Sequence, residues 1–121
     1  METATLISVE EYVRTSYPDG DREYVDGRVV ERNMGEFDHS HWQTRIASYL
    51  VVRYKQFWTG VELRVQVKPT RFRVPDVTVT CAAKPGTGIL TVPPLLVVEV
   101  LSKDDRAGDL QEKIEIGRAH V

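Results

Sequence analysis

Apolar and polar residues follow one another along the first third of the chain in patterns typical of a helix and then a hairpin. Ser8 and Glu11 have the spacing of a capping box, and the apolar residues after Ser8 recur at helical steps, which predicts a short amphipathic helix. Residues 22–25 and 28–31 flank Asp26-Gly27, a dipeptide suited to the positive φ angles of a two-residue turn. They predict a β-hairpin.

A longer helix is predicted from Asp38, which can cap its start, to about Trp58, before Gly60. Apolar side chains recur along one side of this segment at three- and four-residue steps: Trp42, Ile46, Tyr49, Leu50 and Phe57. A helix with this pattern buries that side. Trp42, Tyr49, Phe57 and Trp58 are therefore expected to pack inward, in preference to the alternative that they serve as base-stacking platforms.

Three strands are predicted to follow this helix. Residues 61–67 alternate between apolar and polar, as in a strand with one buried and one wet face. Residues 74–81 form a second strand that opens at Pro75, a position that tolerates proline. After a loop at 85–88, residues 95–101 are apolar on both faces, as in a central strand covered by helices.

A last helix is predicted near the end of the chain. Ser102 and Asp109 both begin capping-box spacings, and Asp109 is favoured because Gly108 suits the turn before a cap. The order of elements predicts one α/β (mixed α+β) domain, with a mixed sheet flanked by helices.

Composition narrows the class of protein without naming a partner. The 121 residues carry a formal net charge of −2, so the chain lacks the basic excess of a protein that coats nucleic acid. The single Cys81 excludes an internal disulfide and a multi-cysteine zinc site. Residues 1–11 lack a signal-peptide pattern, and no apolar run approaches the roughly 20 residues that span a bilayer. A cytoplasmic protein is expected, with no membrane segment.

The most informative residue is Glu99, a charge inside the apolar segment 95–101. An ionised carboxylate removed from water needs compensation by a cation or by strong hydrogen-bond donors. The pattern alone leaves a metal ion and a buried Lys or Arg equally open.

Asp76 lies at the start of the preceding predicted strand, so pairing of the two strands could bring the Asp76 and Glu99 carboxylates together on one face. Oxygen ligands from two carboxylates and the Val100 backbone carbonyl suit Mg²⁺ or Mn²⁺. Lys113 follows soon after and could reach back toward Glu99, to orient a water or to neutralise charge on a phosphoryl oxygen.

Other polar residues have two readings each. Glu23 could be a further carboxylate near the metal or a cross-strand partner of an arginine. His39 and His41 lie on different sides of a helix, and the pattern favours help with the helix cap over a DNA-facing or proton-handling His39. Four basic residues form a stripe suited to phosphate contacts or simply to solubility: Arg64, Lys68, Arg71 and Arg73.

Three segments resemble the motifs of the Uma-type putative restriction endonuclease family, a branch of the PD-(D/E)xK nuclease superfamily. They are residues 73–77 (RVPDV), 98–102 (VEVLS) and 109–113 (DLQEK). Residues 23–27 (EYVDG) and His39 also resemble the family, so the likeness runs from about Leu6 to Lys113. The resemblance implies a restriction-endonuclease-like fold, metal-dependent hydrolysis of DNA, and catalytic roles for Asp76, Glu99 and Lys113.

Two features depart from this family pattern. The superfamily motif has lysine two residues after the acidic residue, where this chain has Leu101, so Lys113 would have to replace it. The family also continues past the last helix into a further strand, which is expected to be missing here. Residues 115–121 (EIGRAHV) read as the translation of a common sequencing adapter. We therefore expect a domain over residues 1–114, incomplete at its C-terminus, and a non-native tail over 115–121.

Two functions from different classes follow from these patterns. The first is a Mg²⁺-dependent endonuclease that acts on DNA, with Asp76 and Glu99 holding the metal, and with dimerisation possible because many such enzymes cut both strands. The second is a nucleic-acid- or protein-binding module that keeps the fold after its active site has decayed.

Overall fold

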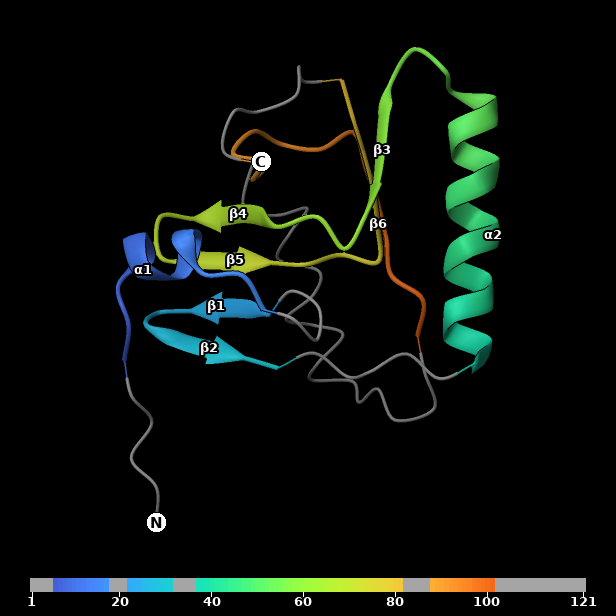
Figure 1. Ribbon diagram of the computed structural model, residues 1–121. Helices are drawn as coiled ribbons and strands as arrows, with labels where there is room; N and C mark the ends of the chain where they lie inside the picture. The colour runs from blue at the N-terminus through green and yellow to red at the C-terminus, as the bar shows by residue number, and fades with distance from the viewer. Residues whose placement is uncertain (1–5, 18–21, 32–36, 82–87, 102–121) are drawn as a thin grey trace.

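The computed structural model describes residues 6–17, 22–31, 37–81 and 88–101, which form two antiparallel sheets with one helix packed on each (Figure 1). The elements in chain order are α1 (Val9–Arg14), β1 (Glu23–Val25), β2 (Arg28–Val30), α2 (Phe37–Arg53), β3 (Trp58–Val61), β4 (Val65–Lys68), β5 (Arg71–Arg73), β6 (Val77–Thr80) and β7 (Leu96–Val98). The predicted α+β class is confirmed. The strand pairs within each sheet are antiparallel, and a parallel pairing occurs as an isolated bridge between Val65 and Leu90.

The first helix and the hairpin form as the sequence predicts. Ser8 caps α1, since its hydroxyl accepts a hydrogen bond from the Glu11 N–H at 3.1 Å. β1 and β2 pair through a turn in which Asp26 and Gly27 have φ angles of +49° and +97°. Both angles are positive, as a two-residue hairpin turn of this kind requires.

The first sheet has the strand order β2-β1-β5-β4 and carries α1 on one face. Its core is aromatic: Tyr12 of α1 packs on Tyr24 and Phe72, with ring centroids 5.0 and 5.1 Å away. The hydroxyl of buried Tyr24 donates a hydrogen bond to the Ile7 carbonyl at 2.7 Å. The polar group that Tyr24 brings into this core therefore has a partner.

The predicted single strand over residues 61–67 is wrong. The segment splits into β3, which pairs in the second sheet with β6, and β4, which pairs in the first sheet with β5. Glu62 turns the chain between them with a φ of +53°, a value that interrupts a strand. The alternation of residue types continues through this break, which is why the pattern alone does not reveal it.

β5 and β6 are likewise separate strands. Residues 71–73, which lie between the two predicted strands, form β5 and pair with both β1 and β4. The strand predicted over 74–81 is shorter, because β6 begins at Val77 and residues 74–76 carry the chain from the first sheet to the second.

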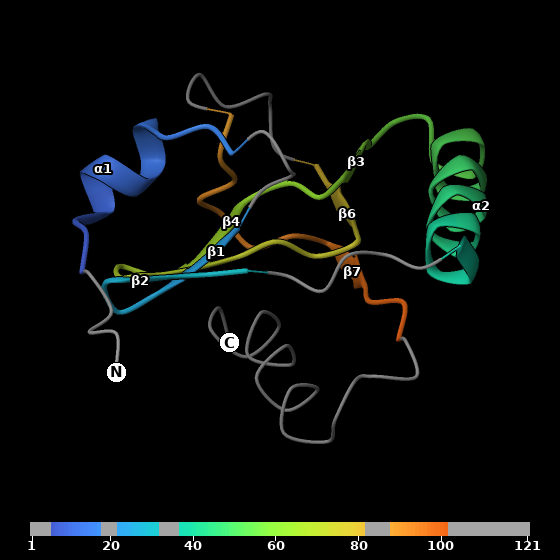
Figure 2. The same ribbon diagram turned by 60° about the horizontal axis from the view of Figure 1, so that its bottom comes forward.

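α2 packs on the second sheet, whose strand order is β3-β6-β7 (Figure 2). Leu50 is buried against Val77 and Val79 of β6, with Ile46 beside it. The helix ends at Arg53 instead of near Trp58, because Trp58 already belongs to β3. Trp42 and Tyr49 are 54% and 62% exposed, so their predicted packing is wrong.

The apolar segment 95–101 contributes a shorter strand than predicted. Within the described ranges, β7 pairs with β6 and stands at the end of the strand order. Leu95 and Leu96 are 54% and 43% exposed, unlike residues of a central strand. Most of the predicted loop at 85–88 and the whole predicted last helix lie outside the described residues. None of the helices in the described segments is long and apolar enough to cross a membrane.

Leu50→Ala is expected to lower the free energy of unfolding by about 2–5 kcal/mol, because it leaves a cavity between α2 and β6. Val52→Ala, on the same helix but 67% exposed, is the matched control and should change it by about 0.5 kcal/mol or less. Urea denaturation measures both. Equal effects would show that α2 does not pack on β6 through Leu50.

Asp26→Asn should lower the melting temperature slightly at neutral pH. Hydrogen bonds from Arg71 and then Thr70 hold the Asp26 pKa below its ordinary 3.8, so the carboxylate stabilises the fold above that value. This contribution is lost as the pH falls through the lowered pKa. Asparagine tolerates the positive φ of the turn, so the difference between wild type and variant should shrink in acid. A difference that is independent of pH would contradict this origin.

Candidate functional site

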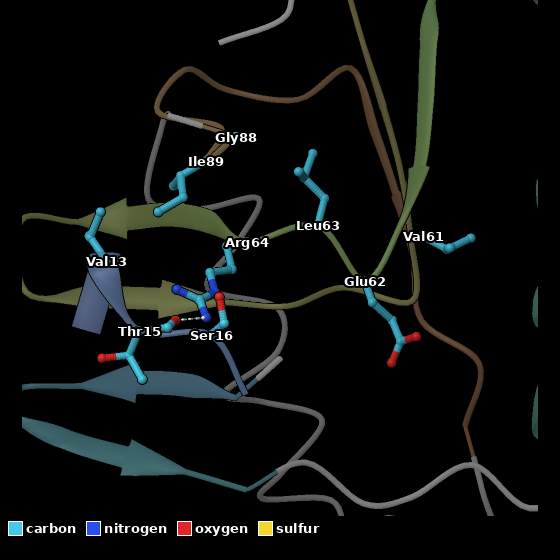
Figure 3. A pocket seen from close by; sticks show the side chains of 9 residues that line it. All are labelled: Val13, Thr15, Ser16, Val61, Glu62, Leu63, Arg64, Gly88 and Ile89. Carbon is cyan, nitrogen blue, oxygen red and sulfur yellow. Dashed lines mark hydrogen bonds between the residues drawn. The ribbon is translucent and has the colours of Figure 1, made fainter. Parts of the chain in front are cut away.

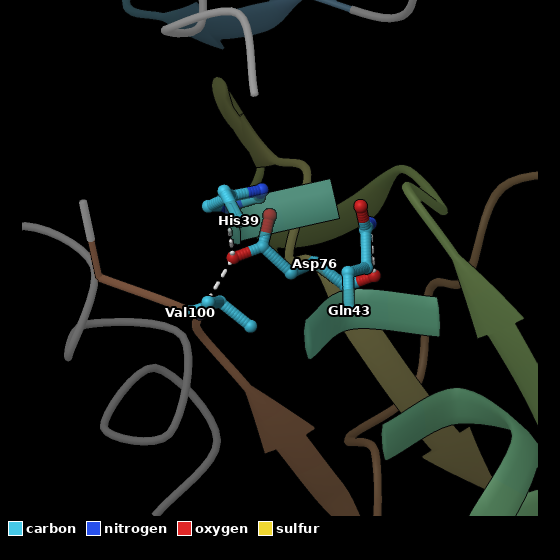
Figure 4. Close-up of polar contacts among 4 residues, drawn as sticks. All are labelled: His39, Gln43, Asp76 and Val100. Carbon is cyan, nitrogen blue, oxygen red and sulfur yellow. Dashed lines mark hydrogen bonds and ion pairs between the residues drawn. The ribbon is translucent and has the colours of Figure 1, made fainter. Parts of the chain in front are cut away.

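Asp76 is a carboxylate buried at the entry to β6, with a relative exposure of 2%. Its Oδ2 accepts a hydrogen bond from the Val100 N–H at 2.7 Å and lies 3.2 Å from His39 Nε2 (Figure 4). Donors at this distance compensate for part of the hydration that a buried carboxylate loses. The side chain is therefore held in one orientation from two sides.

The first two turns of α2 position Asp76 through its side chain and its backbone. His39 and Gln43 are four residues apart and thus lie on the same side of the helix. Gln43 Nε2 donates to the Asp76 carbonyl at 2.8 Å while His39 contacts the carboxylate. Gln43 was not among the site residues predicted from the sequence. The signal that could have identified it is its four-residue spacing from His39 on the helix side that carries Ile46 and Leu50.

His39, which was expected to assist the helix cap, contacts Asp76 through Nε2. An ionised carboxylate only accepts hydrogen bonds, so beside an ionised Asp76 the Nε2 atom would be the donor. His39 Nδ1 is buried and has no hydrogen-bond partner within the part of the chain that the structure describes. In the neutral imidazole, that nitrogen is an acceptor.

The strand register brings Glu99 to the same end of the second sheet. β6 and β7 pair with Val77 opposite Val98, and continuing that register by one residue sets Asp76 opposite Glu99. Directly opposite residues of an antiparallel pair have side chains on the same face. The Val100 N–H contact shows that the chain beyond β7 stays beside Asp76. Val100 was expected to contribute its carbonyl, whereas the contact seen here is made by its N–H.

Glu23 joins β1 to the segment that leads to Asp76. Its Oε2 accepts from the Val74 N–H at 2.9 Å, and its Oε1 lies 3.4 Å from Arg73 Nη1. The side chains of Glu23 and Arg73 are only 13% and 5% exposed. Of the two readings of Glu23, the structure thus provides the arginine partner, on the neighbouring strand β5.

The predicted basic stripe is wrong for two of its four residues. Arg64 is 7% exposed and donates to the carbonyls of Tyr12 and Thr15 at 3.0 and 2.7 Å. Arg73 is buried beside Glu23. Arg71 is paired with Asp26, and Lys68 remains exposed. Arg64 and Arg73 therefore stabilise the fold, and neither presents its charge to a nucleic acid.

A pocket of about 320 Å³ lies beside Arg64, between the end of α1 and the crossing from β3 to β4 (Figure 3). Its lining comprises Val13, Thr15, Ser16, Val61, Glu62, Leu63, Arg64, Gly88 and Ile89. Asp76 is not among these residues, so the pocket is separate from the Asp76 carboxylate. The Arg64 guanidinium already donates to the pocket wall at Thr15.

The described ranges contain no group of three or more His, Cys, Asp and Glu side chains that could hold a metal ion. Two carboxylates remain at the end of the second sheet, Asp76 and Glu99. Lys113, the predicted third catalytic residue, lies outside the described residues.

Comparison with known proteins agrees with this architecture. A crystal structure titled as a putative nuclease belonging to DUF820, from Anabaena variabilis ATCC 29413, matches with a TM-score of 0.76 and 22% sequence identity. The match covers 94% of this chain and 69% of the other. This likeness shows a shared fold.

No curated protein matches the chain. The model of the Uma2 family, described as "Putative restriction endonuclease", matches residues 9–119, which include α1, both sheets, α2 and Asp76. The chain therefore belongs to the Uma2 family.

Proposed function

We propose that this chain is a metal-dependent endonuclease that hydrolyses DNA phosphodiester bonds at the Asp76 end of β6. One observation carries the proposal: the buried Asp76 carboxylate is held by His39 and the Val100 N–H, next to Glu99 in the chain. Continuing the β6–β7 register by one residue sets Glu99 opposite Asp76. A buried carboxylate at a strand end costs stability, so it calls for a function.

The donor set fits a small hard cation. Asp76 and Glu99 offer carboxylate oxygens, and Mg²⁺ is commonly held by one or two carboxylates together with waters and substrate phosphate. Two protein carboxylates therefore suffice, and a third acidic ligand is not needed. The Val100 carbonyl is the proposed third protein oxygen. When bound, Mg²⁺ or Mn²⁺ would activate water and polarise the phosphate.

The role of His39 in this proposal is to position a ligand. With Nε2–H donated to Asp76 Oδ2, His39 fixes which way the carboxylate faces, and Gln43 fixes the backbone beneath it. Such supporting hydrogen bonds commonly contribute about 10–100-fold to metal affinity or activity.

Lys113 is assigned to the same site through the resemblance of residues 109–113 to the family motif. An ammonium there would stabilise negative charge that grows on the phosphoryl oxygens during attack. It replaces the lysine that the superfamily motif has at the position of Leu101.

Asp76→Asn and Glu99→Gln are each expected to reduce Mg²⁺-dependent DNA cleavage at least about 100-fold, since each removes a charged metal ligand. Glu31→Gln changes a carboxylate whose side chain is 76% exposed, and it should leave cleavage unchanged. The rate is measured on supercoiled plasmid with Mg²⁺ or Mn²⁺ and with EDTA. Cleavage that is equal in all variants, or that persists in EDTA, would rule out this site.

His39→Ala is expected to raise the Mg²⁺ concentration for half-maximal activity by about 10–100-fold, because Asp76 loses the donor that orients it. His39→Gln, which offers an N–H at a similar reach, should restore most of the affinity. Isothermal titration with Mg²⁺ checks both variants without DNA. Unchanged or tighter metal binding in His39→Ala would show that His39 does not position the ligand.

A further inference from the structure

One side of α2, beside the side that packs on the sheet, carries two aromatic and two basic side chains, hereafter the outer α2 face: Trp42, Arg45, Tyr49 and Arg53. They recur at steps of three or four residues, so they follow one side of the helix. All four are exposed, Trp42 by 54% and Tyr49 by 62%. The neighbouring side of the same helix buries Leu50 against β6.

Packing does not explain the two aromatic residues. A large aromatic side chain normally goes into a core, where its area contributes most. The pattern of the sequence predicted this for Trp42 and Tyr49, yet both stay exposed to solvent, two turns apart along one side of the helix. The His41 ring stands edge-on to the Trp42 indole, with centroids 5.6 Å apart. An exposed aromatic ring can stack on a flat partner.

The charges on the helix indicate an anionic partner. α2 contains Arg45 and Arg53 and a single acidic residue, Asp38, so its two arginines minus one aspartate give +1 in a chain of net −2. Asp38 lies in the first turn, which leaves the stretch from Trp42 to Arg53 with positive charges only. A purely apolar partner, or the same face of a second copy, would not favour that distribution.

Alternating aromatic and arginine side chains suit an unpaired nucleic acid strand. Exposed bases stack on aromatic rings, and the phosphates between them pair with the cations. A duplex hides the faces of its bases and would use only the arginines. We infer that the outer α2 face binds a single-stranded segment of nucleic acid and leads it toward Asp76.

The outer α2 face lies near Asp76, because one turn of α2 carries both a residue of that face and a residue that contacts Asp76. Gln43, next to Trp42 in sequence, contacts the Asp76 carbonyl from the inner side of the same turn. This inference rests on the proposed nuclease function for its direction, but the binding itself requires neither metal nor catalysis.

The test is fluorescence anisotropy of a labelled oligo(dT) strand with the whole chain carrying Asp76→Asn, in EDTA, so that binding is separated from cleavage. Trp42→Ala and Tyr49→Ala should each weaken binding by about fivefold or more. Arg45→Ala and Arg53→Ala should each lower the slope of log affinity against log salt by about 0.7. Arg28→Ala, at an exposed position of β2 in the other sheet, is the matched control and should leave the slope unchanged.

Trp42→Phe and Trp42→Leu separate stacking from apolar contact in variants that keep a bulky side chain. Phe should keep most of the affinity, and Leu should lose it. Equal binding by Leu and Phe, equal affinity for duplex and single strand, or no binding at low salt would each overturn the inference. So would a monomer–dimer equilibrium, measured by sedimentation, that Trp42→Ala shifts to monomer. None of these results touches Mg²⁺-dependent cleavage, which tests the nuclease proposal separately.

Discussion

The burial of the Asp76 carboxylate is the constraint on which the arrangement of this protein depends. At 2% exposure this side chain needs donors from protein, and they arrive from α2 through His39 and from the chain after β7 through Val100. Its carbonyl accepts from Gln43 and also, at 3.4 Å, from the Glu62 N–H. One residue thus joins segments that are otherwise far apart in sequence.

Local chemistry made the beginning of the chain predictable. The pair Ser8 and Glu11 predicts a helix start, and the pair Asp26 and Gly27 predicts a hairpin turn. Each signal lies within a few residues, and both elements form. The inner side of α2 could also be predicted locally, because the spacing of Ile46 and Leu50 along the helix indicates which side packs on the sheet. Prediction succeeded where neighbours in sequence decide the conformation.

Prediction failed where distant segments decide. The alternation of residues 61–67 does not reveal that Glu62 has a positive φ angle. It also does not reveal that the chain passes there from the second sheet to the first. Arg64 looked like a solvent-facing charge, yet its guanidinium lies over the Tyr12 ring at 4.6 Å and donates hydrogen bonds to the Tyr12 and Thr15 carbonyls. In the candidate site, the sequence pattern drew attention to the carboxylates Asp76 and Glu99. It did not draw attention to Gln43, because the partner of Gln43 is a backbone carbonyl.

The two passages of the chain between the sheets lie side by side. Residues 62–64 lead from the second sheet to the first and residues 74–76 lead back, and the bond from Glu62 to Asp76 ties them together. Asp76 thus lies where two connections between the sheets meet, so a displacement of one sheet against the other would also displace the carboxylate.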